Sequence, residues 1–218
     1  TQWEEALKAF ALTADALPVR FVPGNHDTLL GGLNRYLDYC APTIHGSQDT
    51  AGLWSRVDAG NVHFLLLDVE WSAETFTGQQ ADWLEAQLKS IPDQDWKIVM
   101  SHGFYYASGI TIYGWNWYDN PETIAALTPL FEKYGVDIVF SGHDHIQELL
   151  QHSGVTYVIS GAFGGNPDPS ATYISPASLW YLSGGTGFVD VAINDTEATL
   201  NFRDSSSNVL ESFTVVKN

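Results

Sequence analysis

The spacing of apolar residues predicts an alternation of strands and helices over the first two thirds of the chain. Short β-rich runs that end at turn residues predict strands over residues 19–22, 62–68, 97–100 and 136–140. Apolar side chains at three- and four-residue spacing predict helices over residues 3–16, 77–88 and 122–134. Strands that alternate with helices in this way are typical of an α/β protein with a parallel sheet.

The last third of the chain has a different pattern, with short apolar runs and no helical spacing between them. We predict strands over residues 155–160, 187–193, 198–202 and 209–216. We find no internal repeat, low-complexity tract or linker, and 218 residues are enough to bury one substantial core. The sequence therefore predicts a single domain over residues 1–218.

Composition and charge narrow the range of partners. The chain has 26 acidic and 9 basic residues and a formal charge of -17, so binding to duplex nucleic acid or anionic membranes is disfavoured. No apolar stretch approaches the roughly 18 residues of a membrane span, and Cys40 lacks a second cysteine to pair with. Few lysines, eight tryptophans and loops rich in Gly, Ser, Thr and Asn resemble the composition of secreted bacterial enzymes. We expect a secreted protein that acts on a small molecule.

Histidines follow three of the predicted strands. His26 comes shortly after residues 19–22, His102 after residues 97–100, and His143 and His145 after residues 136–140. One histidine after a strand is more often structural than functional. Parallel strands joined by helices bring such ends to the same edge of a sheet, so the combination predicts one pocket.

The residue types in this pocket suit a metal ion. His143 and His145 are two residues apart on a turn, which allows both imidazoles to point away from the sheet, where their neutral nitrogens bind zinc, iron, manganese or nickel. Asn25 adds an amide oxygen. Nitrogen and oxygen ligands without cysteine argue against a structural zinc site.

Three motifs, Gly24-Asn25-His26-Asp27, Ser101-His102 and Gly142-His143-Asp144-His145, resemble the last three of five signatures of the metallophosphoesterase (calcineurin-like phosphoesterase) superfamily. Purple acid phosphatases and their bacterial relatives look most similar. The resemblance implies a four-layer α/β/β/α sandwich and a hydrolase of phosphomonoesters or phosphodiesters. It also implies a binuclear metal centre whose bound hydroxide attacks phosphorus.

The resemblance assigns a role to each motif residue. It implies that Asn25, His102 and His143 bind one metal ion and that His145 binds the other. His26 would lie beside the substrate as a general acid or as a stabiliser of the transition state. The two ions would be iron, zinc or manganese, which imidazole and amide ligands suit alike.

The chain also departs from the family pattern. The upstream Asp-x-His and Gly-Asp motifs, which supply carboxylate ligands, do not occur before Asn25. We therefore expect that the amino-terminal β-α-β segment is missing, and that the chain alone is inactive and associates with itself or with that segment. Asp27, Asp68 and Asp144 could replace the missing carboxylates, but each is interpreted more simply as a turn or strand-end residue.

Two questions stay open at the level of sequence. Tyr105 and Tyr106 open an aromatic segment over residues 105–118, which could contact a planar substrate or cover the core beneath a long loop. The chain could also be a non-catalytic metal-binding relative or an inactive fragment, or a metal-dependent hydrolase of another ester. The reading frame upstream of residue 1 and a panel of phosphate and carboxylate esters would separate these alternatives.

Overall fold

The computed structural model describes residues 4–5, 8, 18–40 and 53–217. The helix predicted over residues 3–16 lies almost entirely outside these residues, although Glu4, Glu5 and Lys8 are helical. In the described part of the chain, no helix is long and apolar enough to cross a membrane.

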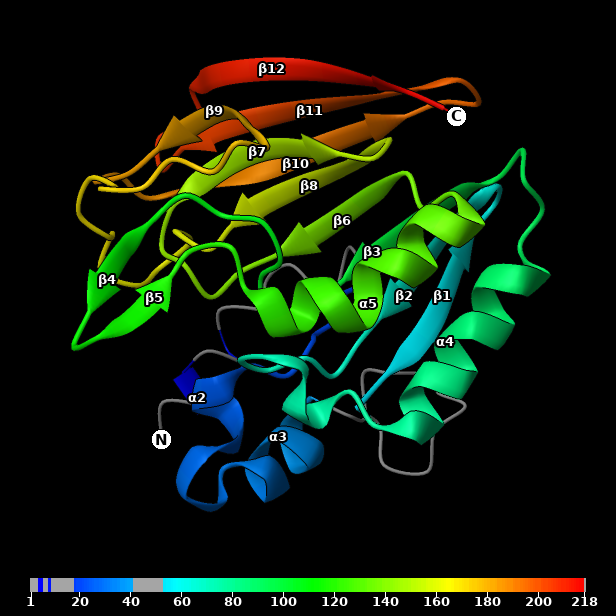
Figure 1. The fold of residues 1–218 in the computed structure, drawn as a ribbon, viewed down its shortest axis with the longest axis horizontal. Coiled ribbons are helices and arrows are strands. Elements are labelled where there is room, and N and C mark those ends of the chain that lie inside the picture. The colour runs from blue at the N-terminus through cyan, green and yellow to red at the C-terminus, as the bar shows by residue number, and fades with distance from the viewer. Residues whose placement is uncertain (1–3, 6–7, 9–17, 41–52, 218) are drawn as a thin grey trace.

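A seven-stranded mixed sheet forms the centre of the molecule (Figure 1). Its strands are β1 (Ser55–Ala59), β2 (Val62–Leu66), β3 (Trp96–Met100), β6 (Ile138–Ser141), β7 (Gln147–His152), β8 (Val155–Ser160) and β9 (Ser178–Leu182), in the order β1-β2-β3-β6-β8-β7-β9. Strands β2, β3, β6 and β8 run parallel, as the alternation with helices predicted. Strands β1, β7 and β9 pair in the antiparallel sense.

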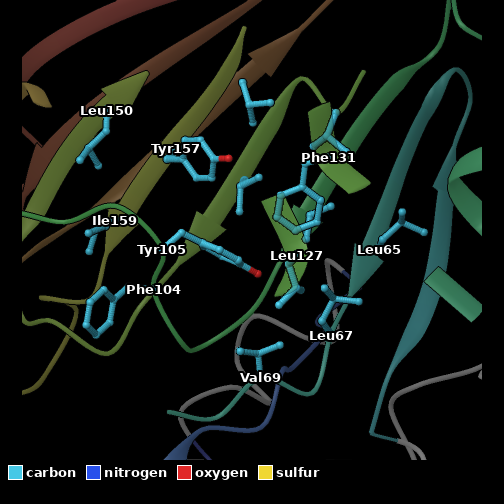
Figure 2. Packing of buried hydrophobic residues seen from close by; sticks show 14 of the residues in the cluster. Leu65, Leu67, Val69, Phe104, Tyr105, Leu127, Phe131, Leu150, Tyr157 and Ile159 are labelled. Carbon is cyan, nitrogen blue, oxygen red and sulfur yellow. The ribbon is translucent and has the colours of Figure 1, made fainter. Parts of the chain in front are cut away.

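Two helices cover one face of this sheet. They are α4 (Gly78–Ser90) and α5 (Pro121–Tyr134), close to the predicted bounds. The side chain of Asn120 accepts hydrogen bonds from the first turn of α5, and Gly135 ends the helix with a φ of 63°. Figure 2 shows Leu127 and Phe131 packed with Leu65 and Tyr157, all fully or nearly fully buried. Burying each such side chain contributes roughly 1.5–3 kcal/mol to folding.

A second, three-stranded antiparallel sheet covers the other face. It contains β10 (Gly187–Ile193), β11 (Glu197–Asp204) and β12 (Val209–Val216). Its inner side chains Leu200 and Phe202 pack against Trp96, Leu149 and Val158 of the central sheet. The α/β sandwich is therefore confirmed, and the described residues supply a helical layer and two stacked sheets (Figure 1).

Short elements complete the described chain. They are α2 (Asn25–Thr28), η1 (Leu29–Gly31), α3 (Leu33–Tyr39), η3 (Ala73–Thr75), β4 (Ile110–Ile112) and β5 (Trp115–Trp117). The strand predicted over residues 19–22 is wrong, because no strand of the described chain pairs with this segment. Cys40 follows α3 and is buried, and burial raises the pKa of its thiol to about 11.

Candidate metal centre

The site begins at the short helix α2. The main-chain N–H of Gly24 donates to Oδ2 of Asp27 at 2.9 Å, and the N–H of Asp27 donates to the carbonyl oxygen of Gly24 at 2.9 Å. This closed turn fixes the start of the helix, so that Asn25 is buried and His26 is exposed. Asp27 therefore acts as a capping residue, in agreement with its interpretation as a turn residue.

Three polar side chains from distant segments meet beside this turn. Oδ1 of Asn25 lies 3.0 Å from Nε2 of His102, which follows β3. The same Nε2 lies 3.3 Å from Nδ1 of His143, which follows β6. The neighbouring ends of the parallel strands β3 and β6 thus bring both histidines to the asparagine.

The backbone leaves little free space around His102. A Cβ atom on Gly24 would lie 2.9 Å from Cγ and Nδ1 of His102, and one on Gly142 would lie 3.4 Å from Nδ1. His143 has a φ of 63°, which is uncommon for a residue with a side chain and often marks a functional turn. The motif glycines therefore allow close packing of the imidazole.

Burial keeps both imidazoles neutral. Burial, followed by the charges of His26 and His145, lowers the pKa of His102 to about 4. Burial and the neighbouring imidazoles lower the pKa of His143 to about 3. At neutral pH both rings are uncharged, and a neutral ring nitrogen carries the lone pair that binds a metal.

His145 lies beside these residues but is oriented by other contacts. Its Nδ1 is 2.6 Å from the carbonyl oxygen of Asn166, and its main-chain N–H donates to Oδ2 of Asp168 at 2.8 Å. Because a carbonyl oxygen only accepts, Nδ1 carries the hydrogen and Nε2 carries the lone pair. An electrostatic interaction with His145 contributes to the lowered pKa of both His102 and His143, so the three rings are near one another.

Asp144 lies between the two histidines of its motif and is 2% exposed. Among the described residues, neither of its carboxyl oxygens has a hydrogen-bond partner. Burial and the nearby Asp168 and Glu148 raise its pKa well above the usual value. Burial and these neighbours disfavour the charged carboxylate, which is the form that binds a metal ion.

The family model of the calcineurin-like phosphoesterases matches residues 1–147. The chain belongs to this family. It is 30% identical over 155 residues to a purple acid phosphatase of Glycine max, covering 69% of this chain and 31% of the relative. It is 28% identical over 174 residues to Fe(3+)-Zn(2+) purple acid phosphatase 12 of Arabidopsis thaliana, covering 76% of this chain and 35% of the relative. The chain thus spans about a third of the length of these curated relatives.

The fold agrees with this membership. The purple acid phosphatase isolated from yellow lupin (Lupinus luteus) seeds superposes with a TM-score of 0.67 at 24% identity, covering 78% of this chain and 34% of that one. At this identity the superposition shows a shared fold. The phosphoesterase motifs therefore lie in the sandwich that the family resemblance implied.

The distances from Nε2 of His102 to the other two donor atoms suit a metal ion of the kind that the family implies. Ligands about 2.1 Å from a metal are about 3.0 Å apart at right angles and about 3.4 Å apart in a tetrahedron. The observed separations of 3.0 Å and 3.3 Å match these values. In the described part of the chain, no group of three or more His, Cys, Asp or Glu side chains is arranged to hold a metal ion. The fit therefore rests on one amide and two imidazoles.

The structure does not bring the two predicted substrate-binding tyrosines to this site. Tyr105 is 1% exposed, lies in the core beneath α5 (Figure 2) and shares a hydrogen bond of 3.2 Å with the hydroxyl of Ser101. Tyr106 packs on His152, with ring centroids 4.5 Å apart. The hydrogen bond to Ser101 and the packing on Phe131, with ring centroids 5.4 Å apart, turn Tyr105 inward, which the sequence pattern alone did not indicate.

Other aromatic residues surround the site instead. Trp71, Trp117 and Phe104 lie with ring centroids 4.5, 5.2 and 5.5 Å from that of His143. The sequence pattern places Trp117 only within the aromatic segment 105–118 and gives no prediction for Trp71. Trp71 lies five residues after the end of β2, near the sheet edge that carries His102. This position is the signal that could have identified it.

Proposed function

We propose that the protein hydrolyses phosphate esters with a metal ion held by Asn25, His102 and His143. The observation that carries the proposal is the meeting of these three donor atoms, from three separate segments, in a member of a phosphoesterase family. We further propose that the complete protein holds two ions, drawn from iron, zinc and manganese, and that Nε2 of His145 binds the second.

The chemistry divides between the metal centre and this chain's own residues. A divalent metal ion bound here would supply positive charge to the phosphoryl oxygens and would activate a water molecule for attack on phosphorus. Asn25, His102 and His143 hold it without adding negative charge. The contact of His145 with Asn166 keeps the Nε2 lone pair available.

His26 is proposed as the residue that donates a proton to the leaving oxygen. It is exposed, and it follows Asn25 directly in α2. A positioned general acid contributes roughly 10² to 10⁴ in rate. The low content of basic residues and the eight tryptophans support a further proposal, that the protein is secreted.

Chelation and mutation of the complete protein test the metal-dependent activity. We expect hydrolysis of a chromogenic phosphate ester to stop after dialysis against a chelator and to return with zinc, manganese or iron. His102→Ala and His143→Ala should each remove most of the activity. His152→Ala is the matched control, because this exposed histidine at the end of β7 packs on Tyr106.

Full activity after exhaustive chelation would refute the proposal. Equal losses in the control and the two site variants would show that the losses reflect folding. Faster hydrolysis of the matched carboxylate ester would assign the site to another class of substrate.

A further inference from the structure

A cavity of about 390 Å³ opens directly beside His143. Its walls come from the segment after β2, the hairpin β4–β5 and the start of α5. Figure 1 shows this hairpin projecting from one end of the molecule. The cavity therefore extends from the candidate metal centre toward the surface, where the part of a substrate beyond the phosphate would lie.

Indole rings form one side of the cavity. Trp117 lies 5.2 Å from His143 and 5.4 Å from Trp71 between ring centroids, and Trp115 continues the row outward. Trp115 is 69% exposed, and none of the three tryptophans belongs to either hydrophobic core cluster of the described residues. These side chains therefore do not cover the core, which was the alternative that the sequence left open.

The base of the hairpin holds these rings in place. Gly109 pairs with Tyr173 through two main-chain hydrogen bonds, of 2.9 and 3.0 Å. A Cβ atom on Gly109 would lie 1.7 Å from the carbonyl oxygen of Trp117, so the hairpin packs against a residue that must be glycine. Asp119 accepts hydrogen bonds from the Ala107 N–H and from the hydroxyl of Ser175. The aromatic wall is thus preformed.

The charged residues that line the cavity are all acidic. Glu74 and Glu122 are exposed at its rim, Asp119 lies at the hairpin base, and no Lys or Arg is among the described lining residues. The hydroxyl of Ser72 donates to Oε2 of Glu122 at 2.5 Å, which holds that carboxylate in place. An anionic group beyond the scissile phosphate would meet like charge here.

We propose that this cavity binds the leaving group of the phosphate ester and selects a planar alcohol that is uncharged or cationic. Aromatic faces stack on any planar ring, and the acidic rim repels a second anionic group. The inference rests on the proposed phosphoesterase function, because the cavity receives a leaving group only if His143 belongs to the catalytic centre.

Kinetics on the complete protein test the aromatic wall. Trp115→Ala should lower kcat/KM for phenyl phosphate by roughly tenfold relative to ethyl phosphate, because stacking is lost only for the aryl ester. Tyr113→Ala is the matched control, since this residue lies at the tip of the same hairpin, is 99% exposed and does not line the cavity. A general loss of activity lowers kcat/KM for both esters equally, so it does not change the ratio of the two kcat/KM values.

A second variant tests the charge. Glu122→Gln keeps the shape of the side chain, and should raise kcat/KM for 3-carboxyphenyl phosphate relative to phenyl phosphate by roughly threefold to fivefold. An unchanged ratio would overturn the role of the acidic rim. An equal effect of Trp115→Ala and Tyr113→Ala on the aryl-to-alkyl ratio would overturn the role of the indole wall.

Direct binding separates this inference from the proposed function. We expect 2-naphthol to bind the complete protein in calorimetry and to quench tryptophan fluorescence, with affinity roughly tenfold lower in Trp115→Ala. If no phosphate ester is hydrolysed but this binding occurs, the proposed function fails and the cavity stands as a site for planar alcohols. Absence of binding to the unaltered protein would overturn the inference.

Discussion

Replacement of Gly24 by alanine should damage the metal centre while the fold persists. The new Cβ would lie 2.9 Å from Cγ and Nδ1 of His102, whereas ordinary van der Waals contact begins at 3.4 Å. The imidazole must therefore move by about 0.5 Å, the difference between these two distances. Three neighbours confine the imidazole. Its Nε2 lies 3.0 Å from Oδ1 of Asn25 and 3.3 Å from Nδ1 of His143, and its Nδ1 would lie 3.4 Å from a Cβ atom on Gly142.

The magnitude follows from the tolerance of such sites. Catalytic constellations have to be held within about 0.5 Å of the productive geometry, and a 1 Å displacement can cost about a hundredfold in rate. We therefore expect Gly24→Ala to lower kcat/KM by roughly tenfold to a hundredfold and to weaken metal binding. Overpacking should cost about 1–3 kcal/mol of stability, which leaves most molecules folded.

The assay combines metal titration, steady-state kinetics and thermal unfolding of the complete protein. Gly78→Ala is the matched control, because a Cβ atom there meets nothing within 4 Å and alanine favours the first turn of α4. Unchanged metal affinity and kcat/KM in Gly24→Ala would refute the packing argument, as would an equal loss in both variants.

Two further predictions concern the proposed acid and the state of the 218-residue chain alone. His26→Ala should slow hydrolysis most for esters with basic leaving oxygens, and an identical loss across leaving groups of different pKa would argue against an acid role. The chain alone should self-associate in light scattering, because an apolar groove of about 430 Å³ lies between the central sheet and β10, an edge strand among the described residues. A stable monomer with two tightly bound metal ions would contradict this expectation and the proposed ligand set.

Much of the fold could be predicted from local pattern. The helices α4 and α5 carry apolar side chains at helical spacing, and the parallel strands β2, β3 and β6 are short apolar runs between turn residues. These signals are strong because each element buries a face or both faces in the core. The histidines after β3 and β6 could be assigned to one site because the ends of parallel strands meet at the same edge of a sheet.

Strands with weaker burial patterns escaped prediction. β1 contains polar residues and lacks the apolar run of a central strand. β9 has apolar side chains over residues 179–182 but is only half-buried. β7 is buried over its first four residues, but two of these are Gln147 and Glu148. Glu148 is tolerated in the core because it accepts from the Ser108 main-chain N–H and from its hydroxyl. Such partners come from distant segments and leave no local signal.

The sequence by itself determined the alternation of elements, the family motifs and the meeting of His102 with His143, because these depend on local periodicity and on the common direction of parallel strands. Asn25 joins them from a segment that is not a strand, so its place was decided by the tertiary structure. Only the tertiary structure decided that Tyr105 belongs to the core and that the tryptophans of the β4–β5 hairpin line a cavity. The direction of an aromatic side chain in an irregular segment depends on hydrogen bonds and packing with distant residues. Here the bond to Ser101 and the packing on Phe131 turn Tyr105 inward, whereas the pairing of Gly109 with Tyr173 holds the hairpin beside His143.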